Sequence, residues 1–224
     1  TELVHIGSGT KNGKDGKPFK TRDGGVMRLE YLLKEIDDEM INKIKENQKE
    51  KENLNIDEAE AEQTAKTVAL AAVKYGDLSN QASKDYIFDI DRFTSFEGNT
   101  GPYILYTIVR IKSILSKYEA KGGDISALKD AIMPAVNAGQ KNLMLSLAKF
   151  NATIESAYEE SAPHKICAYI YELANAFNGF YHDTKILSEE NEELKKSYIS
   201  LLVLTKEILE ACIDMLGFSA PDRM

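Results

Sequence analysis

The chain has 224 residues, which is enough for one large domain or two small ones. Its net charge of −8 argues against non-specific binding of nucleic acid over the whole surface, so any RNA contact must be made by local patches. No apolar run approaches the roughly 20 residues that a membrane span needs. The start of the sequence is no signal peptide and has no initiator methionine, so we expect a cytoplasmic segment of a longer protein.

The first quarter of the chain combines a short apolar run with a loop rich in glycine and lysine. Residues 3–6 (LVHI) predict a buried strand, and residues 7–25 form the loop. From Arg28 to Ile44 the apolar side chains recur at helical spacing, which predicts an amphipathic helix. The charged residues 45–52 have no apolar face and indicate a solvated helix end or loop.

A second helix is predicted from the capping-box-like pair Asp57 and Glu60 up to Gly76, which we expect to end it. Its stripe of buried side chains is Ala61, Ala65, Val68, Ala72 and Tyr75. Small side chains on that stripe indicate close approach of a neighbouring element. A loop follows at 77–83, and residues 85–91 alternate polar and apolar side chains, which predicts a short strand or extended segment.

Residues 96–102 (FEGNTGP) have the composition of a turn, and we place a domain boundary at this point. No strand is predicted beyond Pro102. Helices are predicted over 104–118, 125–133 and 143–158, from Pro163 onward, and from Ser188 to Gly217. Cys167 and Cys212 lie far apart in apolar helical stretches, which indicates core packing and not a disulfide or zinc site. The predicted fold is mainly α, with an all-helical bundle in the second half.

Three segments carry a resemblance to a known family. Residues 16–24 (GKPFKTRDG) resemble the divergent form, seen in arginyl-tRNA synthetases, of the Lys-Met-Ser-Lys-Ser loop of class I synthetases. Residues 96–103 (FEGNTGPY) resemble the entrance to that family's helical anticodon-binding domain, and residues 216–224 (LGFSAPDRM) are similar to its C-terminal ending. In this order and spacing the segments make the whole chain resemble the C-terminal part of a bacterial-type arginyl-tRNA synthetase.

The resemblance implies two domains. Residues 1–95 would be the α-rich end of a class I catalytic domain, with a short strand and the lysine loop, and residues 96–224 the helical anticodon-binding domain. The family's nucleotide-binding sheet and His-Ile-Gly-His signature are absent from this sequence, so we expect the chain alone to be inactive. Residues 4–7 (VHIG) carry three letters of the signature, but they lie too close to the lysine loop, so His5 is expected to be a strand residue.

The resemblance also implies the chemistry of the lysine loop. When arginine attacks ATP, negative charge builds on the leaving phosphates, and a cationic loop can stabilise that charge in the transition state. The catalytic candidates are Lys17, Lys20, Thr21 and Arg22. The alternative from the residues alone is a solvated surface loop. ATP, with magnesium, is expected as a substrate of the intact enzyme, whereas no bound cofactor and no metal site are expected in this chain.

Anticodon loops present unstacked bases, which proteins read by aromatic stacking and by hydrogen bonds to base edges. The candidate tRNA-binding residues are Asn99, Thr100, Tyr103, Arg110, Lys112, Tyr181, His182 and Met224. The implied partners are arginine tRNA, with arginine and ATP in the intact enzyme, and the implied state is a cytoplasmic monomer without a membrane contact. Two alternatives remain open: a helical adaptor that binds proteins, and a generic α-rich protein whose loop binds phosphate.

Overall fold

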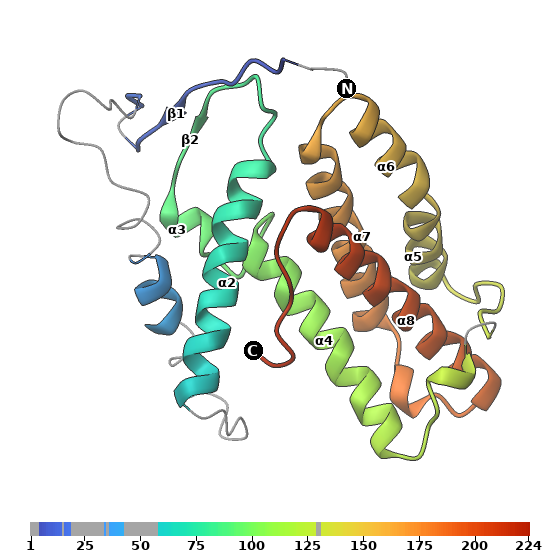
Figure 1. Cartoon of the computed structure of the whole chain (residues 1–224). Coiled ribbons are helices and arrows are strands. Elements are labelled where there is room, and N and C mark those ends of the chain that lie inside the picture. Colours follow the sequence, from blue (N-terminus) through green and yellow to red (C-terminus); the bar gives the residue numbers. More distant parts are fainter. Residues whose placement is uncertain (1–4, 15, 19–33, 35, 43–57, 129–130) are drawn as a thin grey trace.

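The structure is a computed structural model, and it describes residues 5–14, 16–18, 34, 36–42, 58–128 and 131–224 (Figure 1). Most of the first predicted helix, with Leu29, Leu33 and Ile44, lies outside these residues. The part that is described, residues 36–42, is helical, and Ile36 and Met40 are fully buried. None of the helices in the described part of the chain is long and apolar enough to cross a membrane.

The N-terminal part contains one small parallel sheet. Strand β1 (Lys11–Asn12) pairs with β2 (Tyr86–Ile87), with Lys11 opposite Tyr86. The strand predicted at residues 3–6 is wrong over its described end, because His5 and Ile6 have no strand geometry and Ile6 is 50% exposed. The extended chain around residue 86 pairs instead with the base of the glycine- and lysine-rich loop.

Helix α2 (Glu58–Leu78) buries all five side chains of its predicted stripe. The predicted stop at Gly76 is wrong, because the helix continues for two more residues. A Cβ on Gly76 would lie 2.5 Å from the ring of Phe93, so this glycine makes room for an aromatic side chain. Phe93 belongs to the short helix α3 (Ile90–Phe93), which replaces the end of the predicted extended segment.

Helix α4 (Gly101–Ala120) starts three residues before the predicted position. The Thr100 hydroxyl oxygen caps the helix, because it accepts a hydrogen bond from the Tyr103 N–H at 3.2 Å. Pro102 is tolerated in the first turn, where a backbone N–H has no partner within the helix. A Cβ on Gly101 would lie 2.4 Å from the Ala71 carbonyl oxygen, so the start of α4 contacts α2 directly. The proposed domain boundary before residue 96 stays a prediction.

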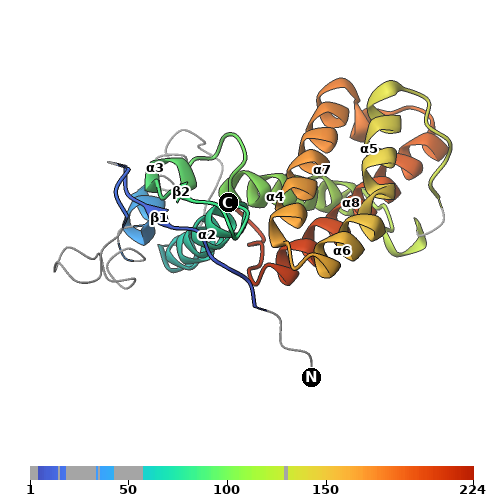
Figure 2. The same cartoon turned by 90° about the horizontal axis from the view of Figure 1, so that it is seen from above.

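The second half is a helical bundle with α7 at its centre (Figure 2). Its elements are α5 (Ala138–Ala148), α6 (Phe150–Glu159), α7 (Pro163–Asp183), α8 (Glu192–Met215) and the 3-10 turns η1 (Ser126–Leu128) and η2 (Ile186–Ser188). Helix α7 packs against α4, α5, α6 and α8. The start at Pro163 is confirmed, and so is the buried stripe of Ile166, Ile170, Leu173, Phe177 and Phe180.

Three predicted helices of the bundle differ from the structure in their extent. Within 125–133 only η1 is helical among the described residues, and the helix predicted over 143–158 is divided at Lys149. The Lys149 N–H bonds to the Ser146 carbonyl at 3.2 Å, which tightens the last turn of α5, and Tyr158 is left 85% exposed on α6. Helix α8 follows Ser188 as predicted but begins only after Asn191, because the Asn191 amide oxygen caps it.

Candidate nucleic-acid interface and lysine loop

An open groove of about 1250 Å³ lies where α4, α7 and α8 meet the C-terminal tail, residues 217–224. In Figure 1 the tail leaves the end of α8 and runs back between α2 and α4. The groove brings together four of the predicted RNA-binding residues: Arg110, Lys112, Tyr181 and Met224. The helical spacing of apolar residues could not predict that these four side chains lie together, because they belong to three separate elements: α4, α7 and the tail.

The Arg110 guanidinium is held in a defined position within the groove. Its Nη1 donates a hydrogen bond to the Asn178 amide oxygen at 2.6 Å, and its Cζ lies 4.8 Å from the centroid of the Tyr106 ring and 5.6 Å from that of Tyr181. Tyr181 stacks on the buried Phe177 ring and keeps 40% of its surface exposed. A planar cation beside a supported aromatic ring is suited to stacking against an unstacked base.

The seam between α4 and α7 continues this polar and aromatic surface. The Tyr103 hydroxyl donates to the Asn175 amide oxygen at 2.6 Å and accepts from the Asn178 amide nitrogen at 2.9 Å. The Tyr103 ring meets the Tyr171 ring edge to face, with centroids 5.7 Å apart. Tyr171, Asn175 and Asn178 were not among the candidates predicted from the sequence. Their spacing of four and three residues, continued by Tyr181, places them on one face of α7 and was the available signal.

The groove has a local excess of positive charge. Five cationic side chains line it (Arg110, Lys112, Lys117, Lys206 and Arg223), against three carboxylates (Glu119, Glu210 and Asp222). The chain as a whole carries −8, so a groove lined by more cationic than anionic side chains is a place where phosphates can be accepted.

Lys112 is less available to a phosphate than the sequence suggested. Its ammonium lies 3.1 Å from Asp222 and 3.4 Å from Glu210, and it donates to the Pro221 carbonyl at 3.2 Å. Arg223 pairs with Glu60 on α2 at 3.1 Å. In this structure Lys112 therefore fastens the C-terminal tail to α4.

The other predicted RNA-binding residues lie outside the groove. Asn99 is exposed, and its amide oxygen accepts from the Tyr75 hydroxyl at 2.5 Å. Thr100 is 5% exposed, and its hydroxyl caps α4 and donates to the Ser95 carbonyl at 2.6 Å, so the structure gives this side chain a task within the fold. The His182 side chain is 88% exposed and lies 2.9 Å from Asp183.

Of the lysine loop, the structure describes the base. Lys17 is exposed, and its carbonyl accepts the Gly13 N–H at 2.9 Å, which closes a turn. Lys20, Thr21 and Arg22 lie outside the described residues. Two further loop cations bind carboxylates: Lys11 lies 2.7 Å from Asp77, and Lys14 pairs with Asp89 and Asp91. Among the described residues, no group of three or more His, Cys, Asp or Glu could hold a metal ion.

The helical bundle belongs to a known class of anticodon-binding domains. Residues 104–224 match the family described as DALR anticodon binding domain, and residues 1–90 match the family described as tRNA synthetases class I (R), catalytic domain. The chain therefore belongs to the DALR anticodon-binding domain family, whose model matches more than half of it. The resemblance drawn from the three sequence segments is confirmed at this level, and so is the mainly α fold.

Several relatives support the assignment. An arginine–tRNA ligase of Agathobacter rectalis is 99% identical over the whole chain, which covers 38% of that protein. An arginine–tRNA ligase of Alkaliphilus oremlandii is 54% identical over 99% of the chain and 36% of its own length. The solved Thermus thermophilus arginyl-tRNA synthetase aligns with 98% of the chain and 35% of its own, with a TM-score of 0.80 and 25% identity. The chain thus spans just over a third of the relatives that it matches.

Proposed function

We propose that this chain binds the anticodon stem-loop of an arginine tRNA in the groove between α4, α7 and α8. We further propose that it supplies the lysine loop of an enzyme that joins arginine to that tRNA with ATP. The observation that carries the RNA half is the stack of Arg110 against Tyr106 and Tyr181 in a groove with excess positive charge. The whole reaction is supported by the relatives, which are arginine–tRNA ligases.

Each part of the groove has a distinct chemical task in this proposal. Tyr181 offers an aromatic face to an unstacked anticodon base, and the other N–H groups of the Arg110 guanidinium donate to base or phosphate oxygens. Lys117 and Lys206, which line the same groove, attract the phosphate backbone, and this fixes the register of the RNA without reading its sequence. Met224, which lines the same groove, supplies an apolar contact.

The lysine loop has its task in the activation of arginine. Lys17, together with Lys20, Thr21 and Arg22 beyond the described residues, would contact the phosphates of ATP and its magnesium ion as pyrophosphate leaves. The proposed partners are arginine, ATP and arginine tRNA, and the proposed state is a monomer in the cytoplasm. This chain alone should not catalyse arginine-dependent exchange of pyrophosphate into ATP, and such exchange would contradict the proposal.

Replacement of Tyr181 tests the RNA half directly. The variant Tyr181→Ala removes the exposed ring from the groove, and we expect it to weaken binding of an arginine-tRNA anticodon stem-loop about tenfold, since stacking of one base contributes about 1–3 kcal/mol. The matched control is Tyr158→Ala, which removes an 85% exposed tyrosine from α6. Fluorescence anisotropy at one salt concentration measures both. Equal affinity of the two variants would contradict this role of the groove and favour the adaptor alternative.

A further inference from the structure

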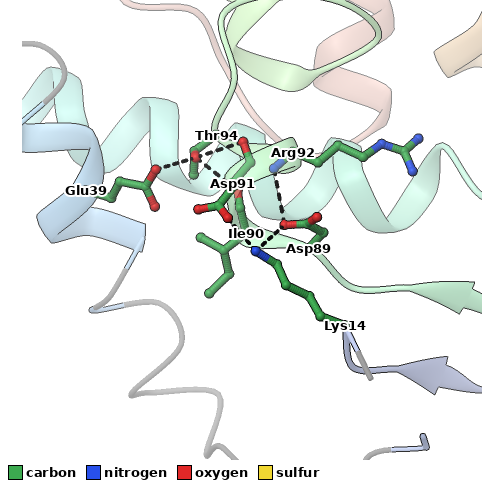
Figure 3. Close-up of polar contacts among 7 residues, drawn as sticks. All are labelled: Lys14, Glu39, Asp89, Ile90, Asp91, Arg92 and Thr94. Carbon is green, nitrogen blue, oxygen red and sulfur yellow. Dashed lines mark hydrogen bonds and ion pairs between the residues drawn. The ribbon is translucent and has the colours of Figure 1, made fainter. Parts of the chain in front are cut away.

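Lys14 connects the base of the lysine loop to helix α3 (Figure 3). Its ammonium lies 3.2 Å from the Asp89 carboxylate and makes a closer ion pair with Asp91. Asp89 is the N-cap of α3, and its side chain accepts a hydrogen bond from the Arg92 N–H at 3.4 Å. Hydrogen bonds to Asp91 and Asp89 raise the pKa of Lys14, so the ammonium keeps its charge throughout the neutral range.

Helix α3 is a firm attachment point for this contact. At its far end the Thr94 hydroxyl, which can donate one hydrogen, lies 2.9 Å from the Glu39 carboxylate and 2.9 Å from the Ile90 carbonyl. Phe93 is 4% exposed and meets the Phe88 ring edge to face, with centroids 4.9 Å apart. An exposed ion pair between two mobile side chains contributes little to stability. Here one of the partners, Asp91, belongs to α3, which is packed against its neighbours.

Lys14 lies inside the closed turn that contains Lys17. The Gly13 N–H donates to the Lys17 carbonyl and the Gly16 N–H donates to the Gly13 carbonyl, each at 2.9 Å. Gly16 has a φ of +72°, which favours glycine at that point of the turn. The strand before this turn is already held next to α3, because the Asn12 carbonyl accepts the Phe88 N–H at 2.8 Å. The ion pairs of Lys14 therefore add a second attachment between the turn and α3.

We propose that Lys14 is a positioning residue, which bridges Asp89 and Asp91 and thereby fixes the turn that presents Lys17. The inference rests on the proposed role of the loop at the ATP phosphates. In this proposal the loop cations have different roles: Lys17 contacts ATP, whereas Lys14 binds two carboxylates and does not touch ATP. It also gives Asp91 a role, because this carboxylate pairs with the Lys14 ammonium and holds it at α3.

A double-mutant cycle separates positioning from direct contact with ATP. Lys14→Ala, Asp91→Asn and the double variant would be made at the equivalent positions of the full-length Agathobacter rectalis enzyme, and the KM for ATP measured by arginine-dependent pyrophosphate exchange. We expect each single variant to raise the KM about fivefold with little change in kcat, and the double variant to be no worse than either. Lys14→Arg should restore most of the loss, and Lys84→Ala, in the turn before β2, is the control.

Two outcomes would overturn the proposal. If Asp91→Asn leaves the KM unchanged or lowers it while Lys14→Ala raises it, the ammonium of Lys14 contacts ATP itself. If Lys17→Ala raises the KM while Lys14→Ala does not, the anchor has no bearing on the presentation of Lys17. A Lys17→Ala enzyme with an unchanged KM would instead contradict the proposed function of the loop.

A second measurement uses this chain alone and needs no activity. Amide exchange of Gly13 and Gly16, followed by NMR, reports whether the turn stays closed. We expect exchange at both amides to be about fivefold faster in Lys14→Ala and in Asp91→Asn than in the Lys84→Ala control. Equal exchange rates in all three variants would overturn the anchoring role, whatever the fate of the proposed function.

Discussion

Cys167 and Cys212 illustrate how burial changes the chemistry of single residues in this fold. Both are fully buried and free, on α7 and α8. Burial raises the pKa of each thiol from 9.0 to about 12. A thiol that stays protonated in the folded chain but ionises in the unfolded chain makes the stability of the fold depend on pH.

The sign of this dependence is a loss of stability in alkali. The contribution is fully present below pH 9 and is lost as the pH rises toward 12, because the unfolded state releases protons that the folded state retains. Each thiol should cost about 1 kcal/mol of unfolding free energy at pH 10. Urea unfolding at pH 7 and pH 10 measures it. The double variant Cys167→Ala, Cys212→Ala should lose less stability between these two pH values than the parent chain, and an equal loss would contradict the assignment.

At the scale of residues, the sequence predicted which side chains are buried better than it predicted which side chains contact one another. The buried stripes of α2 and α7 follow from helical spacing alone, and Tyr75 and Phe177 were both predicted to be buried. The partners of Lys112 could not be predicted, because Glu210 and Asp222 lie about a hundred positions away in the chain and are brought near by the packing of α8 and the tail. The same holds for the stack of Arg110 on Tyr181.

At the scale of elements, two glycines that looked alike in sequence have opposite roles. Each follows an apolar helical stripe and each was predicted as a stop. Gly76 stays inside α2, because its missing side chain leaves room for Phe93. Gly217 does end α8: it has a φ of +80°, its N–H bonds to the Asp214 carbonyl at 2.8 Å, and the Phe218 N–H bonds to the Ile213 carbonyl at 3.1 Å. Only the packing distinguishes the two cases.

A pair of glycine substitutions tests this account of the helix ends. Gly217→Ala forces a side chain into a left-handed conformation and should lower the free energy of unfolding by about 1 kcal/mol. Gly179→Ala should raise it by up to about 1 kcal/mol, because Gly179 lies within α7 and a Cβ there meets no atom within 4 Å. Urea midpoints of the two variants give both values. If both substitutions shift the urea midpoint in the same direction, Gly217 does not stabilise the fold through its helix cap.

At the scale of the whole molecule, the chain is acidic, but more cationic than anionic side chains line the groove between α4, α7, α8 and the tail. The resemblance in sequence predicted RNA binding and named candidate residues for it, but it did not predict that Arg110, Lys112, Tyr181 and Met224 share one groove. That grouping depends on α4 and α7 running side by side and on the tail folding back between α2 and α4 (Figure 1). Lys112 and Arg223 hold the tail in this position through Asp222 and Glu60.

The central claim is that the bundle reads the anticodon of an arginine tRNA. The most direct measurement compares the affinity of this chain for an arginine-tRNA transcript and for the same transcript with its anticodon replaced, at one fixed salt concentration. The account predicts at least tenfold weaker binding after replacement, since several base contacts are lost while the phosphate contacts remain. Equal affinity for the two transcripts would contradict it and would mean that this groove does not read the anticodon.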